Sequence, residues 1–245
     1  MPERRPLAPG LSPSAQQRAQ QIVDAAGRVM SRKGYGGTTM KDIAAEAGIA
    51  PGLIHYYFDS KEDLLLAVTG SLCVRMRADS ERAFAASGDL PPIARAWAAL
   101  SATRDHLDQP DQQRLFLETV TLALGEPRVR AQLAQLYEGL LDASTAMVEE
   151  LSSQVPTPPP VPLRDFASVL VAAIDGMALQ KLIDPSRDLD ALYRAFGFLM
   201  MSCLAASYGI AGLPMPSLED FAAVVSGSFP SPPQPDAPRG EEAPR

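Results

Sequence analysis

Apolar residues recur at intervals of three and four along most of this chain, a spacing that places them on one face of an α-helix. The first such stretch carries Ile22, Ala25, Ala26, Val29 and Met30. Further stretches of this kind cover about 61–86, 92–106, 111–125, 127–153, 163–183 and 187–208, with a short last one at 217–225. Strand-like alternation is rare, so the pattern predicts an all-α protein with short loops.

Prolines mark where the predicted helices stop. Fifteen of the 23 prolines fall within residues 1–13, 156–162 and 230–244. Proline lacks the amide hydrogen and fixes φ, so these stretches cannot be helix interiors. They predict a flexible arm at 1–13, a loop between two helices and a disordered tail at 226–245. Between arm and tail we expect two helical domains, 14–60 and 61–225.

Composition narrows the class of protein. Of 245 residues, 46% are hydrophobic, and the two cysteines lie in apolar helical stretches, which fits a reducing cytoplasm. No apolar stretch close to the roughly 20 residues of a membrane span is apparent, so no membrane partner is expected. The net charge of −7 divides into +3 for residues 1–58 and −10 for the remainder. A locally positive end on an acidic body fits one oriented contact with nucleic acid.

Residues 39–58 have helix-turn-helix spacing. Thr39 and Asp42 have the spacing of a capping box, Gly48 can end the first short helix, and Pro51 can begin the second. If the apolar residues pack inward, the second helix exposes a short, aromatic and hydrogen-bonding face. Such a helix can read a DNA major groove. The alternative from the residues alone is a helical hairpin with a half-exposed aromatic edge.

The flanking residues carry a family resemblance. The run GYGGTTMKDIAAEAGIAPGLIHYYFDSKEDLL, from Gly34 to Leu65, resembles the DNA-binding domain of the TetR family of bacterial transcription regulators. Beyond it the likeness is one of architecture, apart from the segment 173–180, which resembles part of the family's dimerisation helix. The resemblance implies a three-helix DNA-binding domain joined by a long helix to a ligand-binding and dimerisation domain.

The resemblance also assigns residues to DNA contacts. It implies that Thr39 contacts phosphate and that Lys41 reaches phosphate or a base. By a weaker analogy it implies that Thr38 contacts phosphate as well. The residues implied at the groove are Gly52, Leu53 and His55, and the residues implied at the flanking backbone are Tyr56, Tyr57 and Lys61. Two positions depart from the family pattern: Ala50 replaces a polar cap, and His55 replaces the commoner tyrosine.

The body has wide apolar helix faces. The family resemblance implies a ligand pocket among the predicted helices 92–106, 111–125, 127–153 and 163–183. The residues expected around it are Trp97, Leu100, Arg104, Phe116, Thr119, Leu122, Tyr137, Met147, Asp175 and Met177, with plain core packing as the alternative. The residues expected at a homodimer seam are Leu170, Ile174, Phe196, Leu199, Met200 and Cys203, with an intramolecular core as the alternative. Asp175 needs a partner if it is buried, either a cationic or polar ligand or a group at the seam.

Together these features predict a homodimeric regulator, more specifically a repressor, that binds a palindromic operator and responds to an unknown small-molecule effector. No catalytic constellation, metal cluster or cofactor motif is apparent, so neither an enzyme nor a cofactor is expected. The alternative is a helical small-molecule-binding or protein-interaction module that no longer reads DNA.

Overall fold

The computed structural model describes residues 12–88, 90, 92–158 and 160–212. Within them the chain is helical and contains no strand, which confirms the predicted all-α class. The helices are α1 (Pro13–Gly37), α2 (Met40–Ala47), α3 (Pro51–Tyr57), α4 (Lys61–Ala86), α5 (Pro92–Leu107), α6 (Pro110–Gly125), α7 (Pro127–Ser152), α8 (Leu163–Ile183) and α9 (Leu189–Ile210). The predicted short helix at 217–225 and the tail lie outside the described residues, as does most of the arm.

Local chemistry explains most of the helix ends. The Thr39 and Asp42 capping box forms at α2, and Gly48 ends this helix in the left-handed conformation at φ 66°. Ser60 caps α4 by accepting a hydrogen bond from the Asp63 amide. The spacing of Ser14 and Gln17 predicts a cap for α1 at Ser14, but Ser12 caps this helix, because Pro13 takes the first helical position, where no amide hydrogen is needed.

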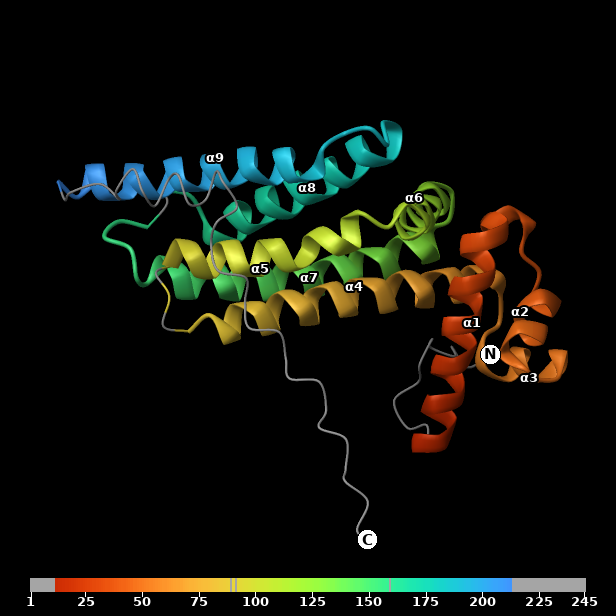
Figure 1. Cartoon of the computed structure of the whole chain (residues 1–245). Helices are drawn as coiled ribbons and strands as arrows, with labels where there is room; N and C mark the ends of the chain where they lie inside the picture. The colour runs from red at the N-terminus through yellow and green to blue at the C-terminus, as the bar shows by residue number, and fades with distance from the viewer. Residues whose placement is uncertain (1–11, 89, 91, 159, 213–245) are drawn as a thin grey trace, which may run out of the picture.

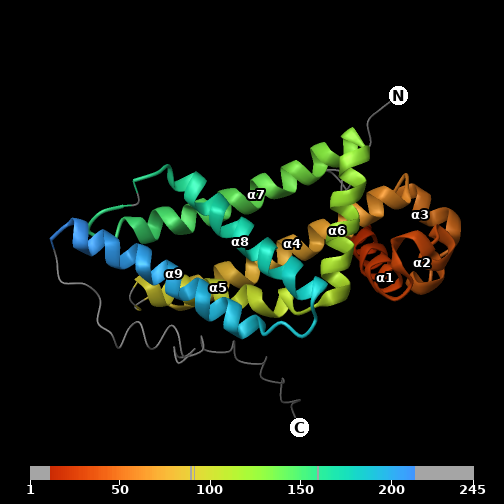
Figure 2. The same ribbon diagram turned by 90° about the horizontal axis from the view of Figure 1, so that it is seen from above.

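The first three helices form a compact unit, here called the head, at one end of an elongated body formed by α4–α9 (Figure 1). The head is built around fully buried Ile22, Met30, Ile43 and Ile54. Leu64 and Leu65 of α4 complete the same core, so the first turn of the long helix is packed into the head. A second view shows that α6 lies between the other helices of the body and α1 (Figure 2).

Within the body, α8 and α9 lie along one side of α4, α5, α6 and α7 (Figures 1 and 2). Within the described residues, α8 is the one helix long and apolar enough to cross a membrane, with a mean hydropathy of 1.6. Charged residues interrupt this helix at Arg164, Asp165, Asp175 and Lys181, so it holds no uninterrupted apolar run of roughly 20 residues. This helix packs against α7 and α9, and its Asp175 accepts a hydrogen bond from Tyr137 of α7.

Candidate DNA-binding and ligand-binding sites

The second helix of the helix-turn-helix, α3, exposes one face. Ile54 is completely buried, and Phe58 at the end of the helix is almost so. This anchoring turns Gly52, Leu53, His55 and Tyr56 outward, and Tyr56 is 64% exposed. The rings of Tyr56 and half-buried Tyr57 pack edge to face with centroids 5.1 Å apart, which orients both phenols. The exposed face combines apolar, imidazole and hydroxyl groups, the kinds of group that contact base edges and phosphates.

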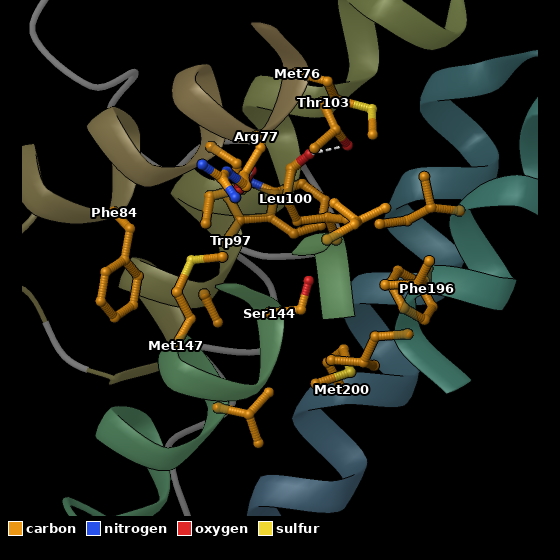
Figure 3. Close-up of a pocket in the computed structure, with 18 of the residues that line it drawn as sticks. Met76, Arg77, Phe84, Trp97, Leu100, Thr103, Ser144, Met147, Phe196 and Met200 are labelled. Carbon is orange, nitrogen blue, oxygen red and sulfur yellow. Dashed lines mark hydrogen bonds between the residues drawn. The ribbon is translucent and has the colours of Figure 1, made fainter. Parts of the chain in front are cut away.

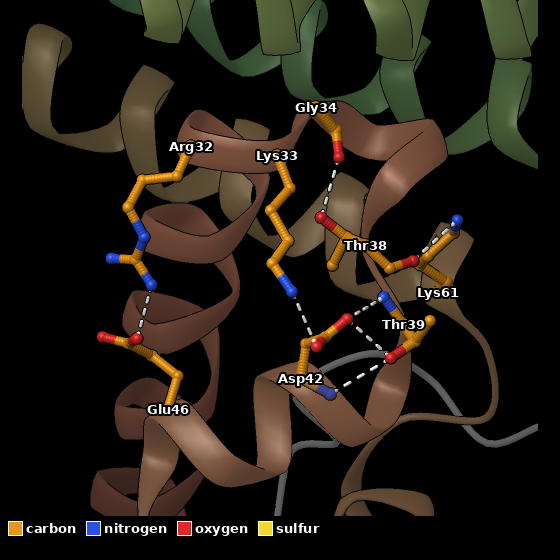
Figure 4. A network of polar contacts seen from close by, with 8 residues as sticks. All are labelled: Arg32, Lys33, Gly34, Thr38, Thr39, Asp42, Glu46 and Lys61. Atoms are coloured by element: carbon orange, nitrogen blue, oxygen red, sulfur yellow. Dashed lines mark hydrogen bonds and ion pairs between the residues drawn. The ribbon is translucent and has the colours of Figure 1, made fainter.

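A polar network holds the start of α2 (Figure 4). The Thr39 hydroxyl donates to the Asp42 carboxylate over 2.7 Å, and the Asp42 amide donates back to this hydroxyl over 3.1 Å. The Lys33 ammonium lies 2.7 Å from the other carboxylate oxygen. Hydrogen bonds from Lys33 and then Thr39 lower the pKa of Asp42 to about 2. Thr39, which this network holds, and the neighbouring Lys41 are both exposed at the start of α2.

Two residues predicted to contact DNA make hydrogen bonds inside the protein. Thr38 is 2% exposed, and its hydroxyl donates to the carbonyl of Gly34 over 2.7 Å. The Lys61 ammonium donates to the carbonyls of Tyr35 and Thr38, and it lies 4.2 Å from the centroid of the Tyr35 ring. These contacts tie α4 to the end of α1. Thr38 therefore lies outside the interface that we propose below, because a buried hydroxyl cannot reach a phosphate.

Internal ion pairs reduce the free positive charge of the head. Arg28 and Arg32 both bind Glu46, over 2.8 and 2.6 Å, and Lys33 binds Asp42. Lys41 is also exposed, but unlike these three cations it makes no ion pair in the part of the chain that the structure describes. Lys41 is thus the lysine of α2 that is available to a phosphate.

Three adjoining cavities lie among the described residues of the body. The central one, of about 130 Å³, lies among α4, α5, α7, α8 and α9 and has a largely apolar wall that includes Phe84, Trp97 and Met147 (Figure 3). An inner cavity of about 60 Å³ lies toward α6 and shares Met76 and Asp175 with the central one. An outer cavity of about 390 Å³ lies under the proline loop. The central and outer cavities share Ala96, Val148, Leu151, Leu170 and Met200.

Asp175 is the one acidic residue in the walls of these three cavities. Its carboxylate accepts a hydrogen bond from the Tyr137 hydroxyl over 2.7 Å. Burial raises the pKa of Asp175, while this hydrogen bond opposes the rise. Burial and the nearby Asp175 charge also raise the pKa of the Cys73 thiol, to about 11. The carboxylate thus sits in an environment that disfavours its charge.

Comparison with known proteins finds a family match in the N-terminal part of the chain. The sequence model of bacterial regulatory proteins of the tetR family matches residues 22–68, which span most of the head and the start of α4. The HTH-type transcriptional regulator BetI of Rhizobium meliloti is 44% identical over 70 residues, 29% of this chain and 34% of that protein. BetI of Burkholderia thailandensis is 29% identical over 168 residues, 66% of this chain and 80% of that protein. Over residues 22–68 the chain thus matches the tetR family.

Solved structures share the fold over both the head and the body of this protein. A TetR-family transcriptional regulator from Mesorhizobium loti matches with a TM-score of 0.66 and 18% identity, over 82% of this chain and 98% of that one. A transcriptional regulator from Saccharomonospora viridis, solved with choline, matches with a TM-score of 0.56 and 22% identity, over 77% and 96%. FadR from Bacillus subtilis, solved with stearoyl-CoA, matches with a TM-score of 0.55 and 20% identity, over 76% and 95%.

The structure brings together only part of the predicted pocket. Trp97, Leu100, Met147, Phe116, Tyr137 and Asp175 line the central or inner cavity. Arg104 instead pairs with Asp190 at the surface, and the buried Thr119 hydroxyl lies 2.7 Å from that of Thr69. Met177 is buried in a core cluster, and Leu122 packs against two others. Helical spacing shows that such residues face inward but does not distinguish a cavity wall from a filled core.

The residues predicted at a dimer seam lie on more than one face of α8 and α9. Leu170, Ile174, Phe196 and Met200 line the central cavity within one chain, so they lie on the inward faces of α8 and α9. Cys203 is exposed and lines the outer cavity. Leu199 alone of this set lies on the outer surface away from the cavities, 61% exposed. The prediction chose the more regular apolar stripe of each helix, and this stripe is the one that the fold covers.

Sequence reasoning also missed several cavity residues. Met76, Ser80 and Phe84 of α4 line the central cavity at four-residue intervals, a spacing that was visible in the sequence. Arg77, Thr103 and Ser144 add polar atoms to the same wall. Pro158, Pro160 and Val161 of the proline loop line the outer cavity, which no local pattern could have indicated.

Proposed function

We propose that this TetR-family protein is a homodimeric transcriptional repressor that binds a palindromic operator through α3 and releases it when a small molecule occupies the body. The observation that carries the proposal is the exposed face of α3, with Gly52, Leu53, His55 and Tyr56 held outward by buried Ile54. Tyr57 and Lys61 stay candidates for contacts with the flanking backbone. Lys61 has two of its three N–H groups already bound within the protein.

Exposed apolar residues support a homodimer. Val169 and Ile183 of α8 are 66% and 74% exposed, and α9 exposes Ala191, Ala195 and Leu199 at four-residue intervals. In Figure 1, α8 and α9 form one edge of the body, and no other described helix lies beyond them. An apolar patch of this kind on a soluble surface usually marks an interface. Two heads on two half-sites would also supply the sequence specificity that one seven-residue helix lacks.

The connected cavities support response to a ligand. The relatives of this fold that were solved with choline and with stearoyl-CoA show that it can hold small molecules. Here α4 both lines the cavities and packs into the head core through Leu64 and Leu65. A ligand that moves α4 would therefore move the two heads of a dimer relative to one another and depopulate the DNA-binding state.

The test is a gel-shift titration with DNA from upstream of the protein's own and neighbouring genes. We expect saturable binding that resists random competitor DNA, and at least tenfold weaker binding by Tyr56→Ala. Tyr208→Ala, which removes a tyrosine of α9 in the body, is the matched control and keeps wild-type affinity. Binding without sequence preference would favour the second candidate, a helical ligand-binding module that no longer reads DNA. The unsupported N-cap at Ala50 is the observation that favours this candidate.

We also propose that the protein works in the cytoplasm, where operator DNA is found in bacteria, and that it catalyses no reaction. The curated relatives are transcriptional regulators, and this supports both statements.

A further inference from the structure

The one acidic residue in the walls of the three cavities has no counter-charge within the described residues. Asp175 faces both the inner and the central cavity, and in the described residues it forms no ion pair. We propose that the effector is an organic cation with an elongated apolar part, and that its cationic nitrogen binds beside Asp175. The inference rests on the ligand-responsive body of the proposed function and adds the chemical class of the ligand.

The groups around Asp175 leave its charge to be neutralised by a ligand. The Tyr137 hydroxyl donates one hydrogen bond, and Cys73 lies nearby in the inner cavity. His106 lines the same cavity, but its Nε2 is 2.7 Å from the Asp79 carboxylate. Arg77 lines the central cavity, but its guanidinium faces Glu81, 3.4 Å away, and the carbonyl of Gly139. A half-buried carboxylate with no cation beside it favours a cationic guest.

Aromatic side chains beside Asp175 fit the same class of ligand. The rings of Phe116 and Tyr137 both line the inner cavity, with centroids 6.1 Å apart and planes at 39°. Tyr137 also holds the Asp175 carboxylate, so an aromatic face and a negative charge meet at one place. An aromatic ring and a carboxylate can together bind an alkylammonium ion, the ring through its quadrupole and the carboxylate through its charge.

The remaining cavity walls fit an apolar chain. From Asp175 the central cavity continues past Trp97, Leu170 and Phe196 to the outer cavity under the proline loop. The outer cavity has no charged residue among its lining residues. An alkyl chain on the cation can follow this path, and each methylene that it buries should strengthen binding about fourfold. The cavities thus favour an amphiphilic cation over a small, fully polar one.

The test uses the full-length protein and the single tryptophan of the chain, Trp97, which lines the central cavity. Decyltrimethylammonium, decyl sulfate and 1-decanol, all kept below micelle-forming concentrations, are titrated while fluorescence is recorded, and calorimetry provides a second measurement. We expect the cation to bind at least tenfold more tightly than either of the others. Asp175→Asn should abolish this preference while 1-decanol binding persists, because asparagine can still accept the Tyr137 hydrogen bond.

Asp165→Asn is the matched control, since Asp165 is an exposed acid on the same helix and lines none of the three cavities. It should keep the preference for the cation. Tighter binding of decyl sulfate would overturn the inference and point to Arg77. An unchanged preference in Asp175→Asn, with the variant shown to be folded by circular dichroism, would overturn it as well.

The same protein is titrated separately with operator DNA, so that the two proposals fail independently. Sequence-specific DNA binding without a cation preference would overturn the ligand class alone. A cation preference without specific DNA binding would support the ligand class and overturn the regulator proposal.

Discussion

The backbone amide of Tyr35, at the end of α1, donates a hydrogen bond to the carboxylate of Glu118 in α6 over 3.1 Å. One turn earlier in α6, Arg114 donates to the carbonyl of Ser31 over 2.6 Å. The same helix lines the inner cavity through Phe116. Thus α6 touches both the head and the cavity, and a ligand that displaces it changes contacts at the end of α1.

Glu118→Ala should loosen this junction. A hydrogen bond to a carboxylate contributes about 1.5–3 kcal/mol when it is buried, and partial exposure here favours the lower end. We expect hydrogen exchange at the Tyr35 amide to rise about tenfold, while exchange in α8 stays the same. Glu149→Ala, at an exposed position of α7, should leave the Tyr35 amide as protected as in the wild type. An unchanged Tyr35 amide in Glu118→Ala would show that this bond does not hold the junction.

Lys41→Ala should reduce the salt dependence of operator binding. Each phosphate neutralised by a cation adds about 0.9 to the slope of log affinity against log salt concentration. We therefore expect the slope to fall by about one for each protomer, with affinity weakened equally for related DNA sequences. Arg75→Ala removes an exposed cation from α4 and should leave the slope as it is. A slope that does not change in Lys41→Ala would place this lysine away from the phosphates.

The double variant Val169→Glu/Leu199→Glu should be monomeric. Both residues lie on the exposed faces of α8 and α9, where paired carboxylates would meet their symmetry mates and resist desolvation. Sedimentation velocity should show a loss of dimer at concentrations where the wild type is dimeric. Leu124→Glu, at an exposed leucine of α6, is the control and should sediment like the wild type. If the double variant stays dimeric, the interface lies elsewhere.

Acid should loosen the head through Asp42. Its pKa falls from an ordinary 3.8 to about 2 in the folded protein because Lys33 and Thr39 hold the carboxylate. The folded state thus prefers the charged form, and the resulting stability is present above pH 4 and lost as the pH falls toward 2. Asp42 carbon chemical shifts followed by NMR should titrate below pH 3. Lys33→Ala should move the midpoint upward, and a midpoint near 3.8 in the wild type would contradict the network.

Helix positions and the helix-turn-helix followed from local chemistry. The capping box at Thr39, the left-handed Gly48 and Pro51 at the start of α3 act over three or four residues, so their effect is visible in a short stretch of sequence. The outward face of α3 was predictable for the same reason, because the position of buried Ile54 sets the direction of its neighbours. The error at Ser14 arose from a choice between two nearby capping residues.

The environment of each side chain could not be read in this way. Lys61 looked free for DNA, yet its ammonium is bound by carbonyls that lie 23 and 26 residues away in the chain. Tyr137 and Asp175 are 38 residues apart and meet because α7 and α8 pack together. Such contacts depend on where whole helices pack, which no short stretch of sequence specifies.

The faces of α8 and α9 show the same division. Amino-acid order determined that both are long, apolar helices, because propensity, periodicity and proline boundaries act locally. Which apolar stripe faces the cavity was decided by packing against α4, α5 and α7, and it put Leu170 and Phe196 inside and left Val169 and Leu199 outside. A helix that is apolar on more than one side has several ways to bury surface, and only the shape of its neighbours selects among them.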